Sequence, residues 1–192
     1  MSRIGQVFAP GRKALIGYVT VGFPTVEETL RIVPALLRAG CDMMELGIPF
    51  SDPLADGPTI QRASHIALDR GVTPEACLET AARLRREVEA PLILMGYYNP
   101  ILALGEAEFC RRAAAAGVDG LIVPDLPPEE GEDLEERARE AGLDLIYLLA
   151  PTSDEERIAL VTARSEGFVY LVSLTGVTGS EAGLPEALED FV

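Results

Sequence analysis

The sequence lacks, or is poor in, several features that specify common functions. Its 192 residues include no tryptophan, one histidine and a single lysine, and the formal net charge is −15 at pH 7. Nucleic acid needs a basic face because its phosphates are negative, so this balance argues against nucleic-acid binding. No apolar stretch is long enough to span a bilayer, and the N-terminal segment lacks the pattern of a signal peptide.

Cysteine and histidine are too sparse for a disulfide framework or a metal site. Cys41, Cys77 and Cys110 are odd in number and show no paired spacing, so we expect three free thiols in a reducing, cytoplasmic setting. His65 lies in an amphipathic segment, where a surface position is expected. Without further histidines or clustered cysteines, the sequence predicts no zinc site.

What the sequence does contain is a regular alternation of apolar and amphipathic segments. The apolar runs are bounded by Gly, Pro or Asp, as strands are, and their near-continuous hydrophobicity is typical of strands buried on both faces. Between them, apolar residues recur at helical spacing. Six such runs occur: ALIGYVTVG, DMMELGI, PLILMGYY, GLIVPDL, DLIYLLAP and FVYLVSLTG.

The ends of two predicted helices carry clear signals. Thr25 is a candidate N-cap with a glutamate three residues later, and Gly40 stands where a helix commonly ends. Pro34, inside that segment, predicts a kink or a break. Thr73 is a second candidate N-cap, because the proline that follows suits the first position of a helix.

Strands that alternate with helices through short connections predict a parallel sheet with right-handed crossovers. Two architectures compete, an open doubly wound sheet and a (β/α)8 barrel. The first strand is not followed by the glycine fingerprint of a dinucleotide-binding fold. Polar residues instead follow several strands, as in barrels, but spacing alone leaves both architectures open. These residues are Thr20, Glu45, Tyr97, Asp125 and Thr178.

The segment ELGIPFSDPLADGPTIQRA resembles the signature of the tryptophan synthase alpha subunit family. Further motifs occur in the family's order and spacing: YVTVGFP, LMGYYNPIL, GLIVPDLPPEE, LLAPTS and YLVSLTGVTG. The resemblance implies a TIM (β/α)8 barrel. It also implies retro-aldol cleavage of indole-3-glycerol phosphate to indole and glyceraldehyde 3-phosphate. A beta subunit would accept the indole in an α2β2 complex, with pyridoxal phosphate on the beta subunit and no cofactor on this chain.

Two carboxylates in this signature are the candidate catalytic groups. Glu45 follows an apolar run, and partial desolvation there would raise its pKa toward the range of a useful acid or base, although a structural acid fits the pattern as well. By resemblance, Glu45 matches the family's general acid/base. Asp56, by pattern an ordinary turn aspartate, matches the carboxylate that stabilises charge on the indole nitrogen. Asp52, in the same loop, is the weaker candidate.

The remaining site residues come from the resemblance alone. Tyr18 would pack on the indole, Tyr97 would lie near the ring and the catalytic glutamate, and Tyr170 would help to hold the site. Each could equally be an ordinary core residue. An apolar pocket and a mobile loop complete the predicted substrate-binding set: Ile60, Ile122, Thr178, which would close against Asp56, and Gly179, whose N–H would bind the phosphate.

The sequence differs from the family in length. We count six strands, whereas a barrel has eight and typically needs about 250 residues. We therefore expect residues 1–192 to form a single barrel domain that is incomplete at its C-terminus, with about six of the βα units. The loops after strands 7 and 8, which hold phosphate in such barrels, would belong to a longer chain, and so would full activity.

Two other functions stay open at this point. One is another phosphate-binding barrel lyase or isomerase of the same pathway, but such enzymes use a lysine at a strand end and the only lysine, Lys13, precedes the first strand. The other is an inactive barrel fragment that acts only as a binding partner. Release of indole from indole-3-glycerol phosphate would distinguish them.

Overall fold

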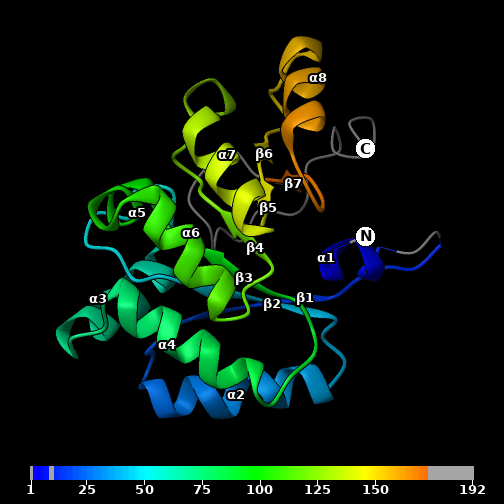
Figure 1. Cartoon of the computed structure of the whole chain (residues 1–192). Helices are drawn as coiled ribbons and strands as arrows, with labels where there is room; N and C mark the ends of the chain where they lie inside the picture. Colours follow the sequence, from blue (N-terminus) through cyan, green and yellow to red (C-terminus); the bar gives the residue numbers. More distant parts are fainter. Residues whose placement is uncertain (1, 9–10, 173–192) are drawn as a thin grey trace.

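The computed structural model describes residues 2–8 and 11–172, and within these ranges strands and helices alternate (Figure 1). The strands are β1 Ile16–Thr20, β2 Met43–Gly47, β3 Leu92–Met95, β4 Gly120–Ile122, β5 Asp144–Ile146, β6 Leu148–Leu149 and β7 Tyr170–Leu171. The helices are α1 Arg3–Val7, α2 Val26–Arg38, α3 Pro58–Asp69, α4 Pro74–Arg85, α5 Tyr98–Leu104, α6 Glu106–Ala115, η1 Pro128–Glu130, α7 Glu132–Ala141 and α8 Glu155–Arg164.

The strands are parallel and follow one another in chain order. Strands β1 to β5 form one sheet, and β6 pairs with β7 in a second. The fifth predicted run is divided at Tyr147, where the backbone N–H donates to Ser165 Oγ at 3.1 Å and the carbonyl accepts from the Tyr170 N–H at 3.0 Å. One segment thus pairs with β4 through its first half and with β7 through its second.

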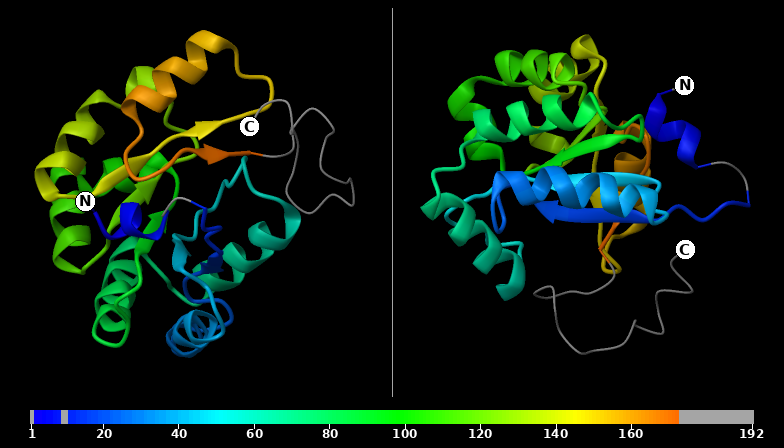
Figure 2. Two further views of the ribbon diagram at one scale, coloured as in Figure 1. Left: turned by 90° about the vertical axis from the view of Figure 1, so that its right-hand side faces the viewer. Right: turned by 90° about the horizontal axis from the view of Figure 1, so that it is seen from below.

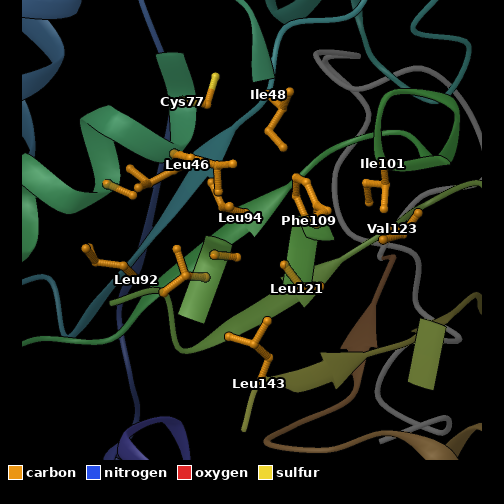
Figure 3. Close-up of a cluster of buried hydrophobic side chains, with 14 of the residues drawn as sticks. Leu46, Ile48, Cys77, Leu92, Leu94, Ile101, Phe109, Leu121, Val123 and Leu143 are labelled. Carbon is orange, nitrogen blue, oxygen red and sulfur yellow. The ribbon is translucent and has the colours of Figure 1, made fainter. Parts of the chain in front are cut away.

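The sheet has two faces with separate cores, because successive side chains of a strand point to opposite sides. The outer face packs against the helices, and Figure 3 shows Leu46, Leu94 and Leu121 of the strands beside Phe109 of α6. The inner face carries a second cluster made of Ile4, Met43, Ile93, Ile122 and Ile146. Helices α2 to α8 surround the curved sheet, whereas α1 lies apart from them and inserts Ile4 into the inner cluster (Figure 2). This is the arrangement of a partial (β/α) barrel.

The helix ends agree with most of the predicted signals. Thr25 Oγ1 accepts from the Glu28 N–H at 3.1 Å, and Thr73 Oγ1 accepts from the Ala76 N–H at 3.3 Å. Gly40 has a φ of 118°, which only glycine adopts readily. The break considered at Pro34 is wrong, since α2 continues through it. Pro34 is buried, and its packing outweighs the lost backbone hydrogen bond.

The amino ends of the strands are held together by a buried carboxylate, Asp119. It accepts from Arg3 at 2.9 Å, from Arg85 at 2.6 Å and from the Leu92 N–H at 2.9 Å. Arg85 also donates to the carbonyl of Gly117 and to two further carbonyls nearby. This network fixes α1 and α4 to the sheet at the end opposite to the predicted site. Within the described ranges, no helix has the length and apolar character needed to cross a membrane.

Candidate active site

Glu45 lies on the inner face of β2, and its side chain is only 4% exposed. In the register of the sheet, it stands between Tyr18 of β1 and Ile93 of β3. The sequence suggested that the strand ends at this residue, which is wrong, because β2 continues to Gly47. Glu45 lies two residues beyond Met43 of the inner cluster, toward the carboxyl end of β2, and its partner in the register of β1, Tyr18, is also polar.

Burial alone raises the pKa of Glu45 from 4.5 to about 7. Among residues 2–8 and 11–172, none donates a hydrogen bond to its carboxylate. Hydrogen bonds or a cationic partner would favour the ionised form and lower the pKa again. Near neutral pH the group therefore exchanges a proton easily, which suits a general acid that later acts as a base.

Asp56 lies in the loop between β2 and α3, and the loop holds its backbone on both sides. Its N–H donates to the Pro53 carbonyl at 3.0 Å, and its carbonyl accepts from Gln61 Nε2 at 2.9 Å. Burial raises the pKa of the half-buried Asp56 carboxyl, and a hydrogen bond with Tyr97 opposes this rise. Asp52 differs, because it is exposed and its carboxylate accepts from Ser51 Oγ at 2.5 Å.

Glu45 and Asp56 both act electrostatically on the same two side chains, Tyr18 and Tyr170. Burial raises the pKa of Tyr18 to about 12, and the charges of Asp56 and Glu45 add to this rise. Burial also raises the pKa of Tyr170, and the charges of Glu45 and Asp56 raise it further. The structure therefore brings β1, β2, β7 and the loop after β2 together around the two carboxylates.

Tyr97, in the turn after β3, also contacts the loop that carries Asp56. Its hydroxyl accepts from the Ala55 N–H at 2.9 Å, and its ring stacks on Phe50 with centroids 5.0 Å apart and an interplanar angle of 27°. The sequence analysis missed Phe50 as part of the site. The signal was available, because Phe50 is the one aromatic residue of the signature segment, but nothing in the spacing indicates which ring it meets.

The two predicted pocket residues lie in different settings. Ile122 is fully buried in the inner cluster, whereas Ile60, in the first turn of α3, is half-buried and belongs to neither of the described core clusters. Thr178 and Gly179 lie outside the described residues. His65 is exposed on α3, and Cys41, Cys77 and Cys110 are free thiols. Among the described residues, no three His, Cys, Asp or Glu side chains form a group that could hold a metal ion.

The comparisons with known proteins agree on one family. The family model for the tryptophan synthase alpha chain matches residues 4–192. The tryptophan synthase alpha chain of Dehalococcoides mccartyi is 59% identical over 192 residues, which cover 100% of this chain and 75% of that protein. The alpha chain of Chloroflexus aurantiacus is 54% identical over 197 residues, which cover 100% of this chain and 74% of that protein.

Solved structures give the same result. The tryptophan synthase subunit alpha of Legionella pneumophila superposes with a TM-score of 0.86 at 40% identity, covering 90% of this chain and 68% of that one. A chain of Mycobacterium tuberculosis tryptophan synthase gives a TM-score of 0.87 at 41% identity, covering 94% and 70%. None of these matches favours either of the other two functions. The chain belongs to the tryptophan synthase alpha chain family.

Proposed function

We propose that Glu45 and Asp56 carry the reaction of this family in the chain. The tryptophan synthase alpha chain is a lyase that cleaves indole-3-glycerol phosphate to indole and glyceraldehyde 3-phosphate. The observation that carries the proposal is the buried Glu45, whose pKa is raised to about 7. A second carboxylate, Asp56, acts together with Glu45 on the same tyrosine, Tyr18.

Glu45 would move both protons. The protonated acid gives its proton to the indole ring carbon that bears the glycerol chain, which turns the ring into a leaving group. The resulting carboxylate then takes the proton of the neighbouring glycerol hydroxyl. As that O–H electron pair forms the aldehyde carbonyl, the carbon–carbon bond breaks and its electrons return to the ring. A group with a pKa near the working pH serves both steps.

Asp56 would stabilise the intermediate between these steps. Protonation of the ring carbon leaves positive charge on the indole nitrogen, and a carboxylate that accepts its N–H stabilises that charge more than it stabilises the neutral substrate. Half-burial of Asp56 strengthens this effect, because charges interact more strongly away from water. Tyr18, Ile60, Tyr97, Ile122 and Tyr170 would bind the ring, and Thr178 and Gly179 would close the site and bind the phosphate.

The partner of an alpha chain is the beta subunit, which receives the indole for tryptophan synthesis. The alpha reaction needs no cofactor, and the pyridoxal phosphate of the complex belongs to the beta subunit. We further propose a cytoplasmic location, which the three free cysteines support. A single domain over residues 1–192 is supported by the outer core, whose members run from Val19 to Leu171.

The test is the substitution Glu45→Gln, assayed for indole release in the presence of the beta subunit. The amide keeps the shape of the side chain but cannot transfer the proton, so we expect kcat to fall by about 10²–10⁴-fold. Asp52→Asn is the matched control, because Asp52 is an exposed carboxylate of the neighbouring loop. Near-normal indole production by the Gln variant, with its circular dichroism spectrum unchanged, would refute the role of Glu45.

A further inference from the structure

We propose that Tyr97 is a positioning residue for Asp56 and holds the loop between β2 and α3 through its hydroxyl group. This inference rests on the proposed role of Asp56. The Tyr97 hydroxyl accepts from the Ala55 N–H at 2.9 Å, and it faces the carboxylate of the next residue, Asp56, closely enough to lower the pKa of that group.

The two links use different capacities of the hydroxyl group. Its oxygen accepts from the backbone of Ala55, so its single proton is available to the Asp56 carboxylate. One phenol thereby holds the main chain of the loop and stands next to the carboxylate of Asp56. Loss of the hydroxyl removes the hydrogen bond to the Ala55 N–H, and among the described residues no other side chain is bonded to that N–H.

Tyr97 can act as a fixed point because it is itself immobilised. Its side chain is 6% exposed, and its ring stacks on Phe50, which belongs to the loop that it holds. Tyr97 is also the residue that precedes α5, and the next residue, Tyr98, donates its N–H to Asp125 Oδ1 at 2.9 Å in the segment after β4. The turn after β3 therefore connects the loop after β2 to the loop after β4.

The loop needs such support because its own contacts leave its tip in solvent. Leu54 is 93% exposed, and Asp52 and Ala55 are exposed as well. Within the loop, the backbone bonds are short-range ones, from the Leu54 N–H to the Asp52 carbonyl and from the Asp56 N–H to the Pro53 carbonyl. The Tyr97 hydroxyl supplies a link to a residue 42 positions away in the chain.

The test compares Tyr97→Phe with Tyr98→Phe in the alpha–beta complex. Tyr97→Phe keeps the ring that stacks on Phe50 and removes only the hydroxyl. Tyr98→Phe is the matched control, because that hydroxyl donates to Glu106 of α6 at 2.8 Å and not to the loop. We expect kcat to fall about tenfold in Tyr97→Phe with KM changed less than twofold, as the loss of one hydrogen bond acting in the transition state predicts. Tyr98→Phe should leave both constants unchanged.

The pH profile adds a readout that a purely structural role would not move. Without the Tyr97 hydrogen bond, the pKa of Asp56 rises, so the acidic limb of kcat/KM should move to higher pH. The other titratable groups that interact with Asp56 are Tyr18 and Tyr170, on which Glu45 also acts, and Asp125 acts on Tyr97. All of them are unchanged in both variants.

Hydrogen exchange of the Ala55 amide separates failure of this inference from failure of the proposed function. Faster exchange in Tyr97→Phe together with a lower kcat supports both. Faster exchange with kcat unchanged supports the positioning of the loop and refutes the catalytic role of Asp56. Exchange at the wild-type rate, or an equal effect of Tyr98→Phe, overturns the inference.

Discussion

Two carboxylates are buried in the same sheet, and their surroundings differ in kind. Asp119, 8% exposed at the amino ends of the strands, accepts hydrogen bonds from two arginines and one backbone N–H. Glu45, 4% exposed and nearer the carboxyl ends, receives none from the described residues, and its pKa is raised to about 7. Similar burial thus goes with hydrogen bonds to the Asp119 carboxylate at one end and with an easily exchanged proton on Glu45 at the other.

The difference indicates what each carboxylate is for. A buried charge is costly unless it is paired, so a structural carboxylate is expected to look like Asp119. A carboxyl group that must give and take a proton cannot be paired in this way, because a cation beside it would keep it ionised. Perturbed pKa values of this kind cluster at functional sites. With the proposed role of Glu45, stability would be the task of the amino ends of the strands and catalysis that of the carboxyl ends, as is usual for this architecture.

The largest effect on stability should come from Asp119→Asn. The variant leaves Arg85, whose side chain is 15% exposed, without its anionic partner, and loss of one member of a buried pair costs about 3–5 kcal/mol. Urea denaturation followed by circular dichroism measures this free energy of unfolding. Glu108→Gln is the control, since the Glu108–Arg111 pair on α6 is exposed, and its midpoint should not move. Equal midpoints for both variants would show that Asp119 is not a structural anchor.

Glu45→Gln should increase the free energy of unfolding, in contrast to Asp119→Asn, and it should do so only at high pH. The folded protein holds the Glu45 proton more tightly than the unfolded chain does, since the pKa rises from 4.5 to about 7. The wild-type protein is therefore at full stability below about pH 4.5 and loses stability up to about pH 7, by roughly 3 kcal/mol at about 1.4 kcal/mol per pKa unit. The Gln variant has no such loss.

Unfolding measured at pH 5 and at pH 8 tests this sign. The stability of Glu45→Gln relative to the wild type should increase by roughly 2–3 kcal/mol between these two pH values. A constant difference between the two proteins would mean that Glu45 is paired in solution, and the contrast with Asp119 would disappear.

Asp56→Asn should have the smallest effect on stability, because Asp56 is half-buried and its loop is held mainly through backbone and Tyr97. We expect a change within about 0.5 kcal/mol in the free energy of unfolding. Its effect should fall on kcat, with KM nearly constant, because the lost charge acts on a cation formed during the reaction. Steady-state kinetics of indole release measures both constants. A higher KM with kcat intact would place Asp56 in substrate binding only.

Much of the fold could be predicted from local pattern. All six apolar runs contain a strand, and the caps at Thr25 and Thr73 form as their spacing indicates. These features depend on residues close together in the chain, so a single sequence contains their signal. The signature segment also indicated Glu45 and Asp56 as catalytic candidates, and these roles stay predictions. By residue pattern alone, a structural acid fitted Glu45 as well, and Asp56 was an ordinary turn aspartate.

Other features depend on contacts between distant residues and leave no local pattern. The sequence did not indicate that α1 inserts Ile4 into the barrel, because Arg3 and Asp119 are 116 positions apart. Neither the division of the fifth strand at Tyr147 nor the stacking of Phe50 on Tyr97 has a periodic signal. The break considered at Pro34 failed for the same reason, since burial of that helix face is decided by the rest of the chain.

By itself, the sequence determined the order of strands and helices, the parallel sheet that this order implies, and the presence of acidic residues in and after the apolar runs. Only the tertiary structure decided that Asp119 is paired and that Glu45 has no partner among the described residues. The pKa of a carboxyl group depends on the solvent and the donors around it, and these come from other strands. Arg85 reaches Asp119 across 34 positions, whereas the described strands that flank Glu45 present Tyr18 and Ile93 to it, and neither is a cation.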